Sequence, residues 1–336
     1  MRLNRRHLLA GLAGLAWARP ALAIEQTRFP VEIAGRPIRS FEPRSPDRRR
    51  FGALQFRGGL VLSCHHPRFG GFSALWRSAD GRDLVSLTDR GYWLTAKVAS
   101  QDGRPAGLEE AEMAAMLDAA GRPLARSKSF DTESLAIAGG HAYVGVERTH
   151  EILRFDWARD GVEARARSLP VPAALKKLPR NRGLEALGIV PAGPHKGAIV
   201  AISERSGRED EPTLGALLGH GAGHGAPAFF QVARPGGYDI TDLAFLPGGD
   251  MLLLERWYRP LRGAGMRIRR VPLAELKGGA LLDGPVLVEA DLGYEIDNME
   301  GLSVHQESGR TILTLISDDN FSVIQRTLLL EFELVA

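Results

Sequence analysis

Four acidic residues occupy corresponding positions in a repeated pattern of the sequence. Each opens a short apolar run that contains leucine: Glu133, Glu185, Asp242 and Glu300. If these runs are equivalent strands around one axis, their carboxylates converge and repel each other unless a cation or protons neutralise them. Ligand sets made only of oxygen suit Ca²⁺ best and Mg²⁺ less well. We therefore predict a Ca²⁺ site at these four acids, with Glu133 and Glu185 also as candidate catalytic residues. The alternative is that each acid only binds backbone N–H groups in its own turn.

A second candidate set is an acid–arginine pair that follows the next apolar run of each copy. The pairs are Asp89-Arg90, Glu147-Arg148, Glu204-Arg205 and Glu255-Arg256. Adjacent residues of a strand point to opposite faces, so the two members of each pair must face different surroundings. Arginines at a channel mouth would bind phosphate or carboxylate in a bidentate manner. On this basis Arg90, Arg148 and Arg205 are candidate catalytic residues, and salt bridges between neighbouring sheets are the competing interpretation.

The last copy departs from this pattern, because Asp318-Asp319-Asn320 follows its second apolar run. The arginine is replaced there by a further oxygen ligand, and Asp319 is therefore an additional candidate metal ligand. Motifs of other chemistries are missing. The sequence has no Gly-x-Ser-x-Gly elbow, His-Glu-x-x-His helix, Walker loop or dinucleotide-type glycine motif after a strand. Nucleophilic serine catalysis and cofactor-dependent redox chemistry are therefore not supported.

The elements that position these residues form a long-period repeat. The copies begin at residues 73, 133, 185, 242 and 300, at intervals of 52 to 60 residues. Spacing of this kind indicates a repeat architecture. Within each copy, short β-rich runs alternate with turns of Gly, Asp and Pro, which predicts a small antiparallel sheet. Radial stacking of such sheets buries their faces and leaves few open edges, so we predict an all-β β-propeller.

The predicted blade number is six. A weaker copy over residues 52–63 would supply the sixth blade, completed by the C-terminal strand 327–332, which closes the ring. Acids at the front and Gly121 at the end predict a short helical insertion over residues 108–120. Helical turns are expected within 171–178 and 272–276. The glycine-rich segment 215–227 is expected to be a loop, in which His220 and His224 form only a weak metal motif.

The N-terminus has the three regions of a secretory signal peptide. Arg5 and Arg6 precede a short apolar run, and Ala21-Leu22-Ala23 provides a cleavage site. The paired arginines resemble the twin-arginine translocation (Tat) signature, and the apolar run is shorter than the ~20 residues that span a bilayer. We expect residues 1–23 to be removed and residues 24–336 to form a single periplasmic domain. The single cysteine, Cys64, excludes an intramolecular disulfide.

The charge balance bears on partners. Residues 1–23 contain four of the 43 basic residues and no acidic residue, so the remainder, with 40 acidic residues, is close to neutral. No basic cluster with interleaved aromatic residues is present. We expect a monomer with no nucleic-acid partner and no membrane association after cleavage. A small anionic or ester substrate is the expected ligand.

The motifs together resemble the phytase-like family of bacterial exported proteins, described by "esterase-like activity of phytase". The resemblance spans about residues 45–335 and rests on the following segments: Leu87-Thr88-Asp89-Arg90-Gly91, Asp131-Thr132-Glu133-Ser134-Leu135, Arg182-Gly183-Leu184-Glu185-Ala186-Leu187, Asn298-Met299-Glu300-Gly301-Leu302 and Ile316-Ser317-Asp318-Asp319-Asn320-Phe321. It implies a β-propeller and calcium-dependent hydrolysis of phosphate or carboxylate esters. The dense Asp-rich calcium loops of true phytases are missing here. Two alternatives remain open, a non-catalytic propeller that binds a ligand or protein and a lactonase-like propeller with one axial calcium.

Overall fold

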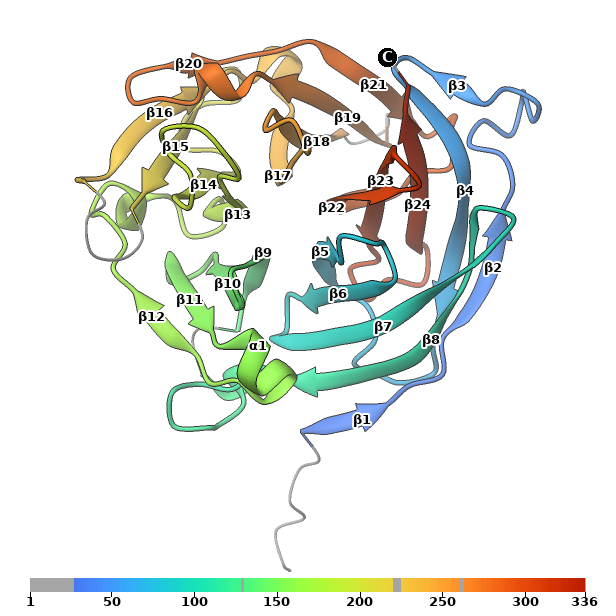
Figure 1. Cartoon of the computed structure of the whole chain (residues 1–336), viewed down its shortest axis with the longest axis horizontal. Coiled ribbons are helices and arrows are strands. Elements are labelled where there is room, and N and C mark those ends of the chain that lie inside the picture. Colours follow the sequence, from blue (N-terminus) through green and yellow to red (C-terminus); the bar gives the residue numbers. More distant parts are fainter. Residues whose placement is uncertain (1–26, 128–129, 220–224, 260–262, 336) are drawn as a thin grey trace, which may run out of the picture.

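The computed structural model describes residues 27–127, 130–219, 225–259 and 263–335. In these ranges the strands form five sheets arranged as a ring around a central axis (Figure 1). The all-β propeller class predicted from the sequence is confirmed. Residues 1–23, with the predicted signal peptide, and His220 and His224 lie outside the described ranges.

Each blade is a sheet whose first strand lies nearest the axis. Blade 1 consists of β5 (Phe72–Arg77), β6 (Asp83–Thr88), β7 (Tyr92–Gln101), β8 (Arg104–Ala115) and, at the outer edge, β1 (Arg28–Pro30). Blade 2 consists of β9 (Thr132–Ala138), β10 (His141–Val146), β11 (Glu151–Phe155) and β12 (Arg167–Leu169). Blade 3 consists of β13 (Leu184–Ile189), β14 (Ile199–Ser203), β15 (Thr213–Leu218), β16 (Ala228–Val232) and β20 (Leu281–Leu282).

The last two blades complete the ring. Blade 4 consists of β17 (Asp239–Phe245), β18 (Met251–Arg259), β19 (Gly263–Val271) and β21 (Val286–Asp291). Blade 5 consists of β22 (Asn298–Glu307), β23 (Arg310–Asp318), β24 (Thr327–Leu334), β4 (Leu54–Ser63), β2 (Ala34–Ile38) and β3 (Arg50–Phe51). The short helical segments are α1 (Trp157–Asp160), η1 (Leu124–Arg126), η2 (Gly161–Glu163), η3 (Leu175–Lys177), η4 (Pro235–Gly237) and η5 (Leu273–Glu275). No helix in the described ranges is long and apolar enough to cross a membrane.

The predicted number of six blades is wrong. Strand β4 pairs antiparallel with β24, from Thr327 opposite Leu62 to Leu334 opposite Leu54, in the blade that β22 begins. The weak copy over residues 52–63 is therefore an outer strand of blade 5 and not a blade of its own. The copy at residue 73 follows too closely to leave room for three more strands. Closure of the ring by N- and C-terminal strands, also predicted, is present.

The helix predicted over residues 108–120 is also wrong, because β8 occupies Arg104–Ala115. Leu108, Ala111 and Met113 of this strand are buried, while Glu109 and Glu110 are exposed. The strand pairs with β7 on one side and with β1 on the other. Pairing and burial of its apolar side chains outweigh the helical propensity of a segment rich in Ala, Glu and Met. The turns expected within 171–178 and 272–276 are present as η3 and η5.

A bulge lies near the start of every innermost strand. The pairing between the first and second strand shifts by one residue there in all five blades, which leaves one residue of the inner strand unpaired: Ser73, Glu133, Glu185, Thr241 and Glu300. An unpaired bulge residue is free of the ladder and turns its side chain out of the regular alternation. The bulges therefore determine which side chains point into the central channel at the end where the innermost strands begin.

Candidate functional site: an acidic pocket on the axis

A cavity with a volume of about 740 Å³ lies at the end of the channel where the innermost strands begin. Three bulge acids line it, namely Glu133, Glu185 and Glu300. One residue at or near the end of the second strand of each blade also lines it: Asp89, Glu147, Glu204, Arg256 and Asp318. With Asp297, which directly precedes β22, eight carboxyl groups and one guanidinium thus line the pocket from all five blades.

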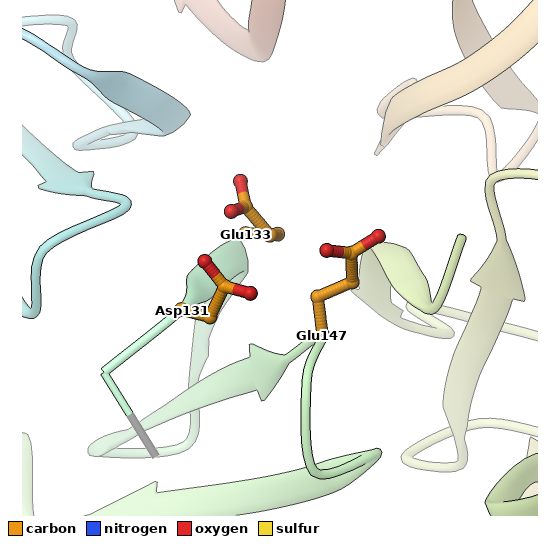
Figure 2. A group of neighbouring side chains, drawn as sticks. All are labelled: Asp131, Glu133 and Glu147. Atoms are coloured by element: carbon orange, nitrogen blue, oxygen red, sulfur yellow. The ribbon is translucent and has the colours of Figure 1, made fainter. Parts of the chain in front are cut away.

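The carboxyl groups form two connected triads. One oxygen from each of Asp131, Glu133 and Glu147 lies within 4.8 Å of the others, and the same holds for Glu147, Glu185 and Glu204. Figure 2 shows Asp131, Glu133 and Glu147 with their carboxyl groups turned toward the same space, from the start of blade 2 and the end of β10. Glu147 belongs to both triads, and its Oε1 accepts a hydrogen bond of 3.1 Å from Gly183 N. Oxygens of Glu147 and Glu185 lie within 4.8 Å of each other, so a proton or a cation is needed to relieve the repulsion of these two carboxyl groups.

Burial dominates the electrostatics of the pocket. It raises the pKa of Glu300 to about 8, of Glu204 and Asp318 to about 7, and of Asp89 to about 6. The pKa values of Glu133 and Glu185 are raised well above the ordinary value, first by burial and then by neighbouring carboxylates, with a hydrogen bond from Ser73 opposing the rise at Glu133. Buried carboxyl groups that repel each other favour neutralisation by protons or by a cation.

Blade 4 differs from the other four blades. Its second-strand position holds Arg256, where the other four blades have acids, and its bulge residue is Thr241, where blades 2, 3 and 5 have glutamates. Arg256 Nε lies 3.0 Å from Glu300 Oε1, and its Nη2 lies 3.6 Å from Glu204 Oε1. The acid of this pair, Glu255, is fully buried behind the pocket between Arg267 and Arg269, at 2.6 Å from each. In blade 4 the arginine of the acid–arginine pair therefore faces the pocket and the acid faces away from it, which is the reverse of blades 1, 2 and 3.

Asp242 is not among the residues that line the pocket, although it begins the fourth repeat. Its Oδ1 accepts a hydrogen bond from Leu243 N at 2.8 Å, and its Oδ2 accepts one from Leu302 N at 2.7 Å. Leu302 belongs to β22, so the side chain fastens blade 4 to blade 5. The cause of the displacement is the bulge at Thr241, one residue earlier than the apparent repeat places it. This is the backbone-binding alternative that the sequence left open.

The three candidate arginines also lie outside the pocket lining. The guanidinium carbon of Arg90 lies 3.3 Å from the centre of the Phe321 ring. Arg148 Nε donates to Asp131 Oδ2 at 3.3 Å, and Arg205 forms an ion pair with Asp239, with Nε donating to Oδ1 at 2.8 Å. These arginines therefore hold loops and neighbouring strands in place around the pocket.

Asp319 is turned away from the pocket as well. Its oxygens accept hydrogen bonds from Gly71 N at 3.1 Å, Phe321 N at 3.0 Å and Thr327 Oγ1 at 3.0 Å. Its neighbour Asp318 lines the pocket instead. The sequence contained a signal for this, because the first acid after the second strand points to the same side in blades 1, 2, 3 and 5. That position identifies four further acids of the pocket that were not predicted from the sequence as catalytic residues or metal ligands: Asp89, Glu147, Glu204 and Asp318.

The fold and site define this chain as a five-bladed propeller with an acidic pocket on its axis. Residues 67–321 match the phytase-like family, described as "esterase-like activity of phytase". This match covers well over half of the sequence, and the chain belongs to that family. No functionally curated protein matches the chain significantly in sequence.

Similar solved structures share little sequence with the chain. Glutaminyl cyclase of Myxococcus xanthus is 14% identical with a TM-score of 0.44, over 84% of this chain and 97% of the cyclase. The PQQ-bound aldose sugar dehydrogenase of Streptomyces coelicolor is 13% identical with a TM-score of 0.45, over 82% of this chain and 97% of the dehydrogenase. At these values the likeness says nothing about function.

Proposed function

We propose that the protein is an exported hydrolase of phosphate or carboxylate esters that uses Ca²⁺ held by axial carboxylates. The observation that carries the proposal is the pair of triads joined by Glu147, each of which brings three carboxyl oxygens within reach of one cation. Their all-oxygen donor set suits Ca²⁺. Asp89 supports the same conclusion, because its Oδ1 is buried without a hydrogen-bond partner.

The triad residues would hold Ca²⁺ in place of the protons that otherwise neutralise these carboxyl groups. A bound divalent cation supplies polarisation of the ester oxygen and a lowered pKa of an attacking water. Glu133 would orient that water as a hydrogen-bond acceptor, since it lies in the first triad and lines the cavity. The acids with pKa values near 7, Glu204 and Asp318, are placed to take or give a proton near neutral pH.

Arg256 would contact the negative charge of the substrate. This is the role that the sequence suggested for Arg90, Arg148 and Arg205, and Arg256 is the arginine that lines the pocket. Its side chain is 28% exposed, so one face of the guanidinium stays accessible while Glu300 and Glu204 hold the other. One guanidinium among eight carboxyl groups favours substrates with a single negative charge over polyphosphates.

The proposal is tested by measuring Ca²⁺ binding calorimetrically and ester hydrolysis with and without EDTA. Glu147→Gln removes the carboxylate common to both triads, and we expect it to weaken Ca²⁺ binding at least about 100-fold and to abolish Ca²⁺-dependent turnover. The matched control is Glu163→Gln, at an exposed acid on the outside of blade 2, which should leave both unchanged. Lack of Ca²⁺ binding by the unaltered protein would overturn the proposal. Ca²⁺ binding without turnover of any ester would instead indicate a ligand-binding propeller.

Export rests on the signal motif of residues 1–23. Expression of the full chain in a Tat-competent bacterium should yield a periplasmic protein that begins near residue 24. Arg5→Lys together with Arg6→Lys should retain it in the cytoplasm, and unchanged export of this variant would overturn the Tat assignment.

A further inference from the structure

Exposed apolar side chains gather on one side of the pocket mouth. Six large hydrophobic residues are exposed in the described ranges, and four of them lie near the end of β18 or on loops of blades 4 and 5: Tyr258, Leu292, Val323 and Ile324. Their exposed fractions are 71%, 58%, 102% and 87%. We call these four residues the apolar ledge. Scattered single apolar residues need no explanation, but a contiguous group marks a binding surface.

The ledge is continuous with the acidic pocket. Tyr258, Leu292 and Ile324 line the same cavity as Glu300 and Arg256. Leu292 is seated on the hairpin of β18 and β19, because a Cβ atom on Gly263 would come within 2.2 Å of Leu292 Cδ1. The ledge is therefore a built wall of the cavity rather than a set of separate surface side chains.

Strand β18 relates the ledge to the charged part of the pocket. Arg256 and Tyr258 are two residues apart on this strand, so their side chains leave the same face about 6–7 Å apart. A group bound by Arg256 would have its next few atoms directed along Tyr258 toward Leu292. The arrangement matches a molecule with a negatively charged head and an apolar chain of a few carbon atoms.

We infer that the apolar ledge binds the apolar part of an ester substrate whose negatively charged group contacts Arg256. This inference rests on the proposed function and narrows it to amphipathic esters. A protein partner is the less suitable occupant, because four side chains at a cavity mouth are far from the roughly 800 Å² per partner of a stable interface.

The test measures binding of monoalkyl phosphates, from butyl to decyl, by calorimetry in the presence of Ca²⁺. We expect the Kd to fall about two- to threefold for each added methylene until the chain extends past the ledge. The double variant Leu292→Ser/Ile324→Ser should lose most of this dependence. Both side chains are largely exposed, so the variant should fold, and an unchanged Ca²⁺ affinity verifies that it does.

The matched control is Leu281→Ser/Val286→Ser, at the two exposed apolar residues outside the ledge, at 57% and 46% exposure. This variant should keep the full chain-length dependence. A Kd that does not change with chain length, or an equal loss in the control, would overturn the inference.

Failure of the ledge and failure of the proposed function give different results. Ca²⁺-dependent hydrolysis that is equally fast for short and long esters would support the proposed hydrolase function and overturn the inference about the apolar ledge. Chain-length-dependent binding without hydrolysis supports the ledge and overturns the hydrolase. Chain-length dependence shown only by alkylammonium ions, and not by alkyl phosphates, would overturn the inference, because the charged group would then bind the acids and not Arg256.

Discussion

The two ends of the central channel are built by the same five strands, yet their chemistry is opposite. At one end lies the acidic pocket of about 740 Å³. At the other end the same inner strands enclose a cavity of about 190 Å³ that is lined mostly by residues with apolar side chains, such as Leu135, Leu187, Leu243 and Phe245. The acids lie where each strand begins with a bulge, and the apolar residues lie where its pairing is regular.

The first residues of the inner strands therefore form the ligand-binding pocket, while the remaining residues of these strands contribute to the stability of the ring. Apolar side chains that pack across the axis stabilise the ring by removing their surface from water. Buried carboxyl groups at the other end oppose folding unless protons or a cation neutralise them. The acidic end should therefore respond to pH and Ca²⁺, while the apolar end should respond to changes of volume.

The largest expected effect is the pH dependence of the metal-free protein. Glu300, Glu204 and Asp318 have pKa values of about 8, 7 and 7 when folded, above their ordinary values of 4.5, 4.5 and 3.8. The folded protein therefore holds more protons than the unfolded chain, and its free energy of unfolding is highest below about pH 4 to 4.5 from these groups and falls up to about pH 8. We expect the Tm in EDTA to decrease by about 5–10 °C between pH 5 and 8.5.

Saturating Ca²⁺ should abolish most of this decrease, since the cation replaces the bound protons. Thermal unfolding followed by circular dichroism at several pH values measures both effects. A Tm in EDTA that rises over this pH range would contradict the raised pKa values.

The next largest effect concerns the apolar end. Leu243 is buried and lies against Gly188 of the neighbouring blade, where a Cβ atom would come within 2.3 Å of Leu243 Cδ1. Leu243→Ala should lower the free energy of unfolding by about 2–4 kcal/mol through lost burial and a cavity. Urea unfolding measures this, and the exposed Leu281→Ala is the control with less than about 0.5 kcal/mol. A change in Ca²⁺ affinity by Leu243→Ala would show that the two ends are coupled.

The smallest effect has the opposite sign. Glu185→Gln removes a buried carboxyl group without changing its shape, so at pH 8 it should stabilise the metal-free protein by about 1–2 kcal/mol. The same substitution should weaken Ca²⁺ binding, because Glu185 belongs to the second triad. Urea unfolding in EDTA and in Ca²⁺ separates the two effects, and destabilisation in EDTA would mean that the ionised side chain supports the fold.

Several parts of the structure follow from local patterns in the sequence. The repeat interval of 52 to 60 residues predicted the propeller, and the acid of each repeat start pointed to Glu133, Glu185 and Glu300, which the structure brings into one pocket. The helix over residues 108–120 did not form, because propensity in a short segment yields to pairing with two neighbouring strands. The blade number required knowing which strand pairs with β24, a contact between residues more than 250 positions apart.

The class of fold, the family and the acidic character of the pocket could be inferred from the sequence alone, because periodicity and composition are local properties of the chain. The tertiary structure decided which members of each charged pair reach the axis. Because the bulge of blade 4 lies at Thr241 and not at Asp242, the side chain of Asp242 points away from the pocket. Arg256 is the charged residue of blade 4 that lines the pocket, and in blade 5 Asp318 lines it while Asp319 does not. One residue of register reverses the face that a side chain occupies, and register is set by pairing across strands rather than by the sequence of one strand alone.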